Sequence, residues 1–418
     1  MAAVLKSIEP DGSESASAAS LWVASEVGQL RRVIVHRPGM ELRRLTPANR
    51  SELLFDDAVW AERAGAEHDA FAEVLRSRSV EVLYLEDLLV EALASPQARG
   101  RLISATLGAL ALGPILTPEL ESWLRSLAPN ELALRLIGGV TFEELPFQSA
   151  SLTGVSGRPD AFAIAPLPNH VFTRDSSSWA FGGVYVHTMA TRARWREALH
   201  LELIYRHHPW FVHADPPFWC DGPHDGPALE GGDILVLGNR CVLVGTGERS
   251  HPAAVELYAE RLFAAGAAER VIAVTVPASR STIHLDAVFT MVDRDAFTVF
   301  PSLLHRLDAY TLTPSRTGMR ARHEPDLFGA IARALGQSRV RLIHGDADAR
   351  TAQREQWDDG NNVLAISPGV VVAYERNEAT NARLTDHGVE VLTIPGSELA
   401  RARGGPRCMS CPIERDHP

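Results

Sequence analysis

The feature that most limits the folds open to this chain is a weak internal repeat of short strands and helices. In residues 233–262, two apolar runs flank a Gly238-Asn239 pair, and a helical stretch follows. Glycine and asparagine between two short β-rich runs are typical of a hairpin turn. The pattern therefore predicts two strands, a helix and a third strand, at Ile234–Leu237, Cys241–Val244, Pro252–Phe263 and Val271–Val276.

The same order of elements recurs elsewhere in the chain. Residues 178–203 and 362–394 repeat it closely, and residues 30–85 and 285–343 fit it more loosely. A ring of five such units leaves few exposed strand edges and surrounds one cavity. We therefore expect an α/β fold in which five pseudo-symmetric units close around a central cavity.

Two stretches differ from the repeat. Residues 86–145 carry apolar side chains at helical spacing, interrupted by prolines, which predicts an inserted group of helices. The first residues are rich in Ser, Ala and acidic side chains. We expect a disordered tail over residues 1–25, a catalytic α/β domain over 26–86 and 150–418, and a helical subdomain over 87–149.

Charge and composition exclude several classes of protein. The net charge of −11 repels nucleic acid and anionic membrane surfaces, and no run of Lys or Arg is present. Residues 1–20 lack the apolar stretch of a signal peptide, and the most apolar segment, Leu102 to Leu116, is too short to span a bilayer. Four Cys in 418 residues do not form a disulfide scaffold. A cytoplasmic protein is expected.

The most unusual stretch is residues 404–412, Gly-Gly-Pro-Arg-Cys-Met-Ser-Cys-Pro. Glycines permit a tight backbone close to a ligand, and Cys408 beside Arg407 is expected to be partly thiolate. Three other interpretations stay open from these residues alone. They are a redox Cys-x-x-Cys pair, which lacks the usual βαβ context, half of a zinc site, which lacks a second pair, and an ordinary loop.

Acidic side chains precede several of the predicted strands. Asp175 and Glu230 open two units, and His284 and Asp286 are two residues apart, so on a strand they face the same side. Several carboxylates around one cavity repel one another unless the ligand is a cation, and two carboxylates can hold a planar guanidinium bidentately. The alternative is that these residues bind a metal ion, but the sequence contains no second cluster of His residues in register that would support a metal site.

Taken together, these motifs resemble those of the bacterial arginine deiminases, which belong to the guanidino-group-modifying (pentein) superfamily. The resemblance runs from about Gly28 to Asp416, and the order of the motifs makes it specific. The motifs are the Leu-Thr-Pro at 45–47 with residues 52–57, Phe-Thr-Arg-Asp at 172–175, Glu-Gly-Gly-Asp at 230–233, His-Leu-Asp at 284–286, Trp-Asp-Asp-Gly-Asn-Asn at 357–362 and the cysteine loop. The resemblance implies a five-unit α/β propeller with an inserted helical subdomain.

The resemblance also implies a role for each matched residue. Cys408 is the expected nucleophile, Asp175 and Asp286 hold the guanidinium, His284 is the general acid and base, and Glu230 supports His284 and the guanidinium. The expected contacts to the rest of the substrate are Arg194 and Arg249 for the α-carboxylate, Asn169, Phe172 and Leu45 for the amino-acid end and stem, and Arg403 on a gating loop.

The expected reaction is hydrolysis of free L-arginine to L-citrulline and ammonia through a covalent thiouronium on Cys408, without metal or other cofactor. A homo-oligomer, dimer or tetramer, is implied as well. The chain departs from the family at Ala400 and Ala402, where many relatives have Gly, and at Cys411, where a disulfide with Cys408 is a hypothesis. Three alternatives are other guanidine reactions (dimethylarginine hydrolysis, agmatine deimination or amidino transfer), a silent arginine-binding protein, and a redox or zinc protein.

Overall fold

The computed structural model describes residues 21–222, 226–344 and 348–418. The repeated unit is clearest around its middle copy, in which β7 (Ile234–Gly238) pairs antiparallel with β8 (Cys241–Thr246). Helix α11 (Pro252–Ala264) then leads to β9 (Arg270–Thr275), which lies parallel to β8. The predicted hairpin, helix and strand are confirmed here to within two residues at each boundary.

Two further units have the same antiparallel pair, helix and parallel strand. Both were predicted at these places, except that residues 285–288, predicted as the start of a strand, form the short helix α12 (Leu285–Val288). Their elements are β10 (Phe289–Asp293), β11 (Ala296–Val299), α13 (Leu327–Leu335) and β14 (Arg341–Ile343), and then β15 (Leu364–Ser367), β16 (Val370–Tyr374), α15 (Glu378–Asp386) and β17 (Glu390–Ile394).

The unit around residue 180 is reduced. Its hairpin, β5 (Ser177–Ala180) and β6 (Gly183–Val186), and helix α9 (Trp195–His207) are present. In place of a third strand, a single bridge joins Val184 to Phe218. Two prolines directly precede Phe218, and proline lacks the N–H that a strand ladder needs.

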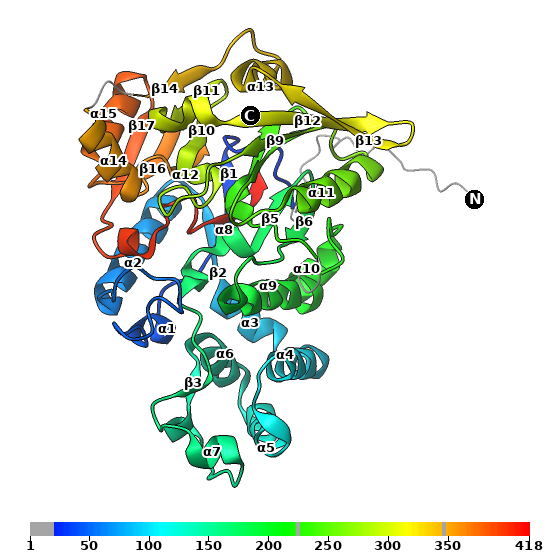
Figure 1. Ribbon diagram of the computed structural model, residues 1–418, viewed down its shortest axis with the longest axis vertical. Coiled ribbons are helices and arrows are strands. Elements are labelled where there is room, and N and C mark those ends of the chain that lie inside the picture. Colours follow the sequence, from blue (N-terminus) through cyan, green and yellow to red (C-terminus); the bar gives the residue numbers. More distant parts are fainter. Residues whose placement is uncertain (1–20, 223–225, 345–347) are drawn as a thin grey trace.

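The first unit is completed by the far end of the chain. Strand β1 (Leu30–Val35) pairs parallel with β2 (Glu81–Tyr84), which follows helix α2 (Ala61–Ser77). On its other edge β1 pairs antiparallel with β18 (Cys411–Arg415), which lies beside it in red in Figure 1. The sequence predicted no strand at 411–415, because the cysteines there were interpreted as part of a loop.

A long hairpin was also missed. Strands β12 (Asp308–Ser315) and β13 (Gly318–Glu324) extend the β7–β8–β9 sheet to five strands and project to one side in Figure 1. The sheets are separate and open. An α/β fold with five related units is therefore present, and closure into a propeller stays a prediction.

The helical segment lies at one end of the molecule, drawn in cyan at the bottom of Figure 1. Apolar side chains at helical spacing, such as Leu116, Leu120 and Leu124, are buried between these helices. Ser95 caps the second helix by accepting the N–H of Ala98. The helices are α3 (Leu85–Ala92), α4 (Pro96–Gly108), α5 (Gly113–Ser126) and α6 (Pro129–Gly138). The exact domain boundaries stay a prediction.

Short elements connect these parts. They are α1 (Met40–Arg43), β3 (Val140–Thr141), η1 (Phe142–Glu144), α7 (Leu152–Ser156), β4 (Phe162–Ile164), η2 (Pro168–Val171), α8 (Thr173–Ser176), η3 (Arg192–Arg194), α10 (Pro209–Ala214), η4 (Gly231–Asp233), α12 (Leu285–Val288), η5 (Pro301–Arg306), α14 (Ala349–Trp357) and η6 (Leu399–Ala402). Within the described residues, no helix is long and apolar enough to cross a membrane.

The predicted tail over residues 1–25 needs correction at its end. Residues 1–20 lie outside the described part of the chain. Residues 21–25 are packed: Leu21 and Val23 are buried, the N–H of Phe181 donates to the carbonyl of Val23, and that of Arg415 donates to the carbonyl of Trp22. These apolar side chains cover the β5–β6 hairpin and the end of β18, so they belong to the core.

Candidate active site

The predicted catalytic residues occupy short turns at equivalent places in different units. Asp175 lies in α8, just before β5, and Glu230 lies just before η4 and β7. His284 and Asp286 lie at the start of α12, before β10, and Cys408 lies in the turn before β18. Each turn therefore precedes the first strand of its unit, which is why residues far apart in sequence meet.

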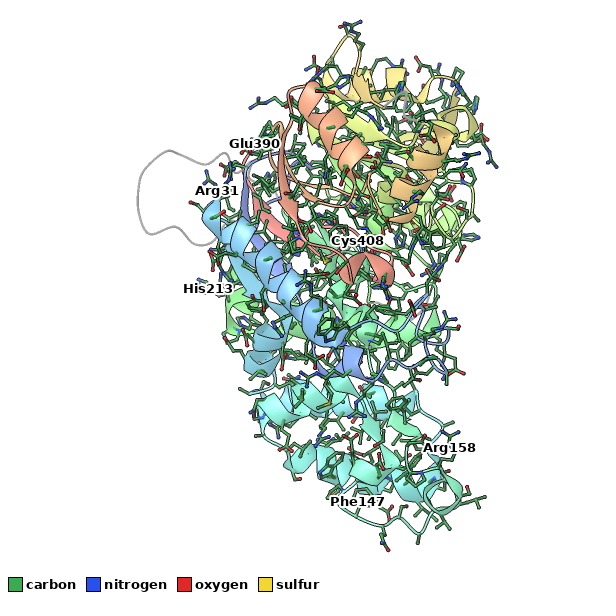
Figure 2. All side chains as sticks on the ribbon, turned by 90° about the vertical axis from the view of Figure 1, so that its left-hand side faces the viewer. Arg31, Phe147, Arg158, His213, Glu390 and Cys408 are labelled. Carbon is green, nitrogen blue, oxygen red and sulfur yellow. The ribbon has the colours of Figure 1, made fainter. Side chains whose placement is uncertain are left out.

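Cys408 is nearly enclosed, with 6% of its surface exposed. Its Sγ lies 3.7 Å from Oδ2 of Asp286, and its backbone N–H donates to Oδ1 of Asn362 over 3.1 Å. Figure 2 shows Cys408 inside the α/β part, away from the helical end where Phe147 and Arg158 lie. Burial, and then the charge of Asp286 and two further aspartates, raise the pKa of Cys408 well above its ordinary value. The resting side chain is therefore a neutral thiol.

The expectation that Arg407 holds Cys408 partly as thiolate is wrong for this resting state. The Arg407 guanidinium donates to Oδ2 of Asp286 over 2.6 Å and to Oε2 of Glu26 over 3.1 Å. It also donates to the carbonyl of Ile234. Two carboxylates thus take up its charge, and the thiol beside it gains too little to ionise.

Asp175 and Asp286 each have one carboxylate oxygen that accepts a hydrogen bond and one that accepts none. Oδ2 of Asp175 accepts from Nη1 of Arg194 over 2.7 Å, as Oδ2 of Asp286 accepts from Arg407. Oδ1 of each is buried and has no hydrogen-bond partner among the described residues. Buried carboxylate oxygens without donors are unfavourable, so the two aspartates are suited to a ligand that donates hydrogen bonds.

His284 is held between two acids. Its Nε2 lies 2.7 Å from Oε2 of Glu230, and its Nδ1 lies 3.8 Å from Oδ1 of Asp175. Burial alone would lower the pKa of His284, but the charge of Asp175 and the hydrogen bond to Glu230 raise it to about 9. His284 is therefore an imidazolium at neutral pH and can give up a proton.

Of the two arginines predicted to bind the α-carboxylate, Arg194 is largely occupied. Besides Asp175, it donates to both carboxylate oxygens of Glu197 and to the carbonyl of Asn169. Arg249 is freer: its Nε lies 3.4 Å from Glu248, and its Nη1 is 3.7 Å from Oε2 of Glu230. The described residues therefore leave Arg249 better placed to receive a carboxylate.

The residues predicted to contact the substrate stem lie near the nucleophile. Leu45 and Phe172 belong to the same buried apolar cluster as Cys408. The side-chain amide of Asn169 donates to the carbonyl of Leu53 over 2.7 Å. The Phe172 ring lies against Gly404, where an added Cβ would come within 2.2 Å of a ring carbon, so the cysteine loop requires glycine there.

Arg403 lies on the segment that leads to this loop, in the left-handed region with φ of 66°. Its guanidinium carbon is 3.8 Å from the centre of the Trp357 ring, and its Nη2 donates to the carbonyl of Arg280. Ala400 and Ala402, where the resemblance led us to expect glycine, are buried in η6 just before it. The predicted gating role of Arg403 stays a prediction.

Cys411 points to a different cluster. It belongs to the apolar cluster around β5 and α9, and its Sγ donates to the carbonyl of Ser177 over 3.4 Å. Cys408 and Cys411 are both free thiols. In the described ranges, no group of three or more His, Cys, Asp or Glu residues is arranged to hold a metal ion.

The sequence profile of the arginine deiminase family matches residues 51–415, which is most of the chain. The chain belongs to the arginine deiminase family. Of the predicted site residues, Leu45 alone lies outside the matched range.

Several solved structures have the same fold. SxtG, an amidinotransferase from Microseira wollei, is 12% identical with a TM-score of 0.56, over 96% of this arginine deiminase-family chain and 98% of SxtG. DDAH from Pseudomonas aeruginosa, complexed with citrulline, is 12% identical with a TM-score of 0.51, over 92% and 99%. Unliganded AgrE is 14% identical with a TM-score of 0.53, over 93% of this chain but only 40% of AgrE. At these identities the likeness shows the pentein α/β fold alone.

Several residues of this arginine deiminase-family site were missed from the sequence. Glu197 holds Arg194 and Glu26 holds Arg407; Asn362, which belongs to the matched motif at 357–362 but was given no role, holds the backbone of Cys408. Glu197 was detectable, because it follows Arg194 by three residues at a helix start, where such pairs meet. Glu26 was not, because it falls just outside the predicted tail and makes only long-range contacts.

Replacing Glu230 with glutamine is expected to lower the pKa of His284 from about 9 toward its ordinary 6.5, because the hydrogen bond to Glu230 raises it. A raised pKa means that the proton is present below about 9 and lost above it. The alkaline limb of the pH–rate profile should therefore move to lower pH. Glu256→Gln, on the exposed face of α11, should leave that limb in place. An unmoved limb in Glu230→Gln would exclude His284 as the proton donor.

Proposed function

We propose that this chain hydrolyses the guanidino group of free L-arginine to give L-citrulline and ammonia. The observation that carries the proposal is the pair of buried oxygens that accept no hydrogen bond, Oδ1 of Asp175 and Oδ1 of Asp286, beside the Cys408 thiol and the His284 imidazolium. Two acceptors suit the N–H groups of a guanidinium, and the thiol suits its carbon. Membership of the arginine deiminase family supports the same reaction.

The first step is positioning. A guanidinium is resonance-stabilised and a poor electrophile, so its carbon must be held against the sulfur. In the proposal, Asp175 and Asp286 accept its N–H groups while their Oδ2 atoms stay paired with Arg194 and Arg407. These arginines fix the two carboxylates, so little reorganisation is needed when arginine binds.

The substrate activates its own nucleophile. The negative charges that raise the pKa of Cys408 are the ones a bound guanidinium neutralises. The pKa of the thiol then falls, its proton leaves to solvent, and the thiolate attacks the guanidinium carbon to give a tetrahedral adduct. The neutral thiol at rest protects the site from other electrophiles.

His284 acts twice. It first protonates the departing nitrogen, the C–N bond breaks, and ammonia leaves a thiouronium on Cys408. The neutral imidazole then removes a proton from a water that adds to the same carbon. The C–S bond breaks, the sulfur recovers a proton, and citrulline forms. Citrulline is neutral, so it loses its attraction to Asp175 and Asp286 and departs.

Arg249 is proposed to bind the α-carboxylate. Arg249→Gln should lower kcat/KM for arginine by about 10- to 100-fold, since charge-assisted hydrogen bonds contribute about 1.5–3 kcal/mol. Agmatine has no carboxylate, so kcat/KM for its slow turnover should change less than about threefold. That factor corresponds to an activation free-energy change of about 0.6 kcal/mol. Arg249→Lys should recover part of the loss. An equal loss with both substrates would place Arg249 in support of Glu230 rather than against the substrate.

The function itself is tested by incubating the purified chain with L-arginine, agmatine or dimethylarginine, in reducing buffer with EDTA, and measuring citrulline, ornithine and ammonia. Equimolar citrulline and ammonia from arginine, with much slower turnover of the other guanidines, support deimination. A different guanidine that is turned over faster than arginine would keep the nucleophile but reject the assigned substrate. Transfer to an added amine would favour an amidinotransferase, and no turnover would reject catalysis.

A further inference from the structure

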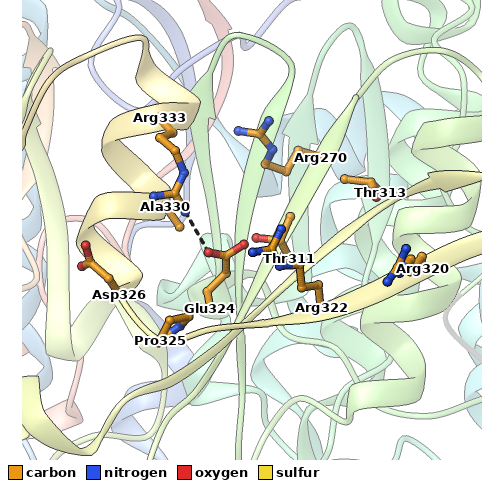
Figure 3. Close-up of a pocket in the computed structure, with 10 residues that line it drawn as sticks. All are labelled: Arg270, Thr311, Thr313, Arg320, Arg322, Glu324, Pro325, Asp326, Ala330 and Arg333. Atoms are coloured by element: carbon orange, nitrogen blue, oxygen red, sulfur yellow. Dashed lines mark hydrogen bonds and ion pairs between the residues drawn. The ribbon is translucent and has the colours of Figure 1, made fainter.

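A groove of about 700 Å³ lies between one face of the five-stranded sheet and helix α13, apart from the residues of the active site. Figure 3 shows that four arginines line it: Arg270, Arg320, Arg322 and Arg333. Two acidic residues, Glu324 and Asp326, lie toward one side. A concentration of cations is unexpected on a chain of net charge −11.

Strand geometry aligns these side chains. Arg320 and Arg322 are two residues apart on β13, so they face the same side of the sheet. Opposite them on β12 lie Thr313 and Thr311, in direct register. Arg270, the first residue of β9, lines the same groove from the next strand. One face of the sheet therefore presents three guanidinium groups and two hydroxyl groups.

Three of the four arginines are unpaired. Arg333 forms an ion pair with Glu324 at 2.8 Å, the dashed line in Figure 3. Arg270, Arg320 and Arg322 have no side-chain hydrogen bond or ion pair within the described ranges. Elsewhere on this surface, arginines such as Arg31 and Arg78 do pair with acids. Three like charges in one groove repel one another, so an anion from outside the chain would relieve the repulsion.

Planar guanidinium groups bind phosphate oxygens bidentately, and threonine hydroxyls add donors. The net charge of the chain opposes a long polyanion, and Glu324 and Asp326 limit the groove on one side. We propose that this groove binds a small anion with two linked phosphate groups. The groove would recognise the diphosphate group itself, whether the diphosphate is free or part of a nucleotide.

The test is titration calorimetry of the full chain with sodium pyrophosphate, without arginine, so that it is independent of the proposed activity. We expect a Kd below 1 mM, which corresponds to a binding free energy of about −4 kcal/mol. The Kd should rise with ionic strength, because salt screens the charges. The double variant Arg320→Gln/Arg322→Gln should bind at least about tenfold more weakly, as losing 1.4 kcal/mol does. Glu324→Gln should bind more tightly, because it frees Arg333.

Arg316→Gln is the matched control, because Arg316 is an exposed arginine at the turn of the same hairpin and does not line the groove. It should bind pyrophosphate like the wild type, and melting temperatures should verify that each variant folds. Pyrophosphate binding supports the proposal. ADP that binds as tightly as pyrophosphate, or more tightly, would identify a nucleotide as the source of the diphosphate, and weaker binding of ADP would identify free diphosphate. No binding by the wild type, an unaffected double variant, or an equal loss in Arg316→Gln would overturn it.

Discussion

Replacing Cys408 with alanine is expected to abolish release of citrulline from arginine, with kcat/KM reduced by at least about 10⁴-fold, as for loss of a catalytic nucleophile. The fold should persist, because the thiol makes one weak hydrogen bond, to Asp286 at 3.7 Å, while the loop is held by the backbone hydrogen bond to Asn362. Citrulline and ammonia assays measure the loss, and calorimetry with arginine should still detect binding to Asp175 and Asp286.

Cys411→Ala is the matched control for Cys408→Ala. Both thiols are buried and only three residues apart, but Cys411 contacts the carbonyl of Ser177 in a separate apolar cluster. Its replacement should leave turnover within a few-fold of the wild type, in the presence or absence of reductant. If Cys408→Ala kept more than about 1% of the wild-type activity, its activation free energy would have risen by less than about 3 kcal/mol. Cys408 would then not be the nucleophile.

The second large effect is on stability. Arg407→Met should lower the free energy of unfolding by about 3–5 kcal/mol, because it leaves two carboxylates, those of Glu26 and Asp286, buried without their cation. Burial alone would raise the pKa of Glu26, but Arg407 and then Arg174 lower it to about 2. A lowered pKa contributes stability that is complete above 4.5 and is lost as pH falls toward 2. Without Arg407 this lowering is largely lost, so the stability of the variant should depend less on pH between 4.5 and 2 than that of the wild type.

Urea unfolding of the full chain measures the effect. Glu26→Gln combined with Arg407→Met should cost less than the two single replacements added together, because the double variant removes one of the unpaired charges. An Arg407→Met protein that unfolds at the wild-type urea concentration would show that water reaches these acids and that the network contributes little. Arg376→Met, on an exposed pair with Asp358, should change stability by less than about 1 kcal/mol.

The sequence predicted best what is local. The units around residues 240 and 370 were placed to within two residues, because each consists of neighbouring strands with a turn of glycine or asparagine between them. The unit around residue 297, whose turn is Arg294-Asp295, was placed less closely: its first strand begins four residues later than predicted. The turn of Glu230 could also be located, since it lies shortly before a predicted strand, whereas His284 and Asp286, expected on a strand, lie at the start of helix α12. The resemblance to arginine deiminases then supplied roles that spacing alone left open.

Long-range pairing was not predictable in the same way. Strand β18 pairs with β1, and β12 joins β9 across an intervening unit, so neither pairing is marked in the local pattern. The partners of arginines were equally hidden. Arg407 was expected to polarise the thiol, but its neighbours Glu26 and Asp286 come from distant segments and take up its charge.

The pairing of β1 with β18 also sets the order of events during synthesis. Arg31 on β1 is joined to Asp416, 385 residues later in the chain. Until that stretch has left the ribosome, one apolar edge of β1 has no partner, and such late, non-local pairing is slow and prone to aggregation. The turn that carries Cys408 directly precedes β18, so it is fixed in place only at this last docking step. A nascent chain therefore lacks the arranged Cys408 turn until β18 pairs, and its demand on chaperones should fall at that point.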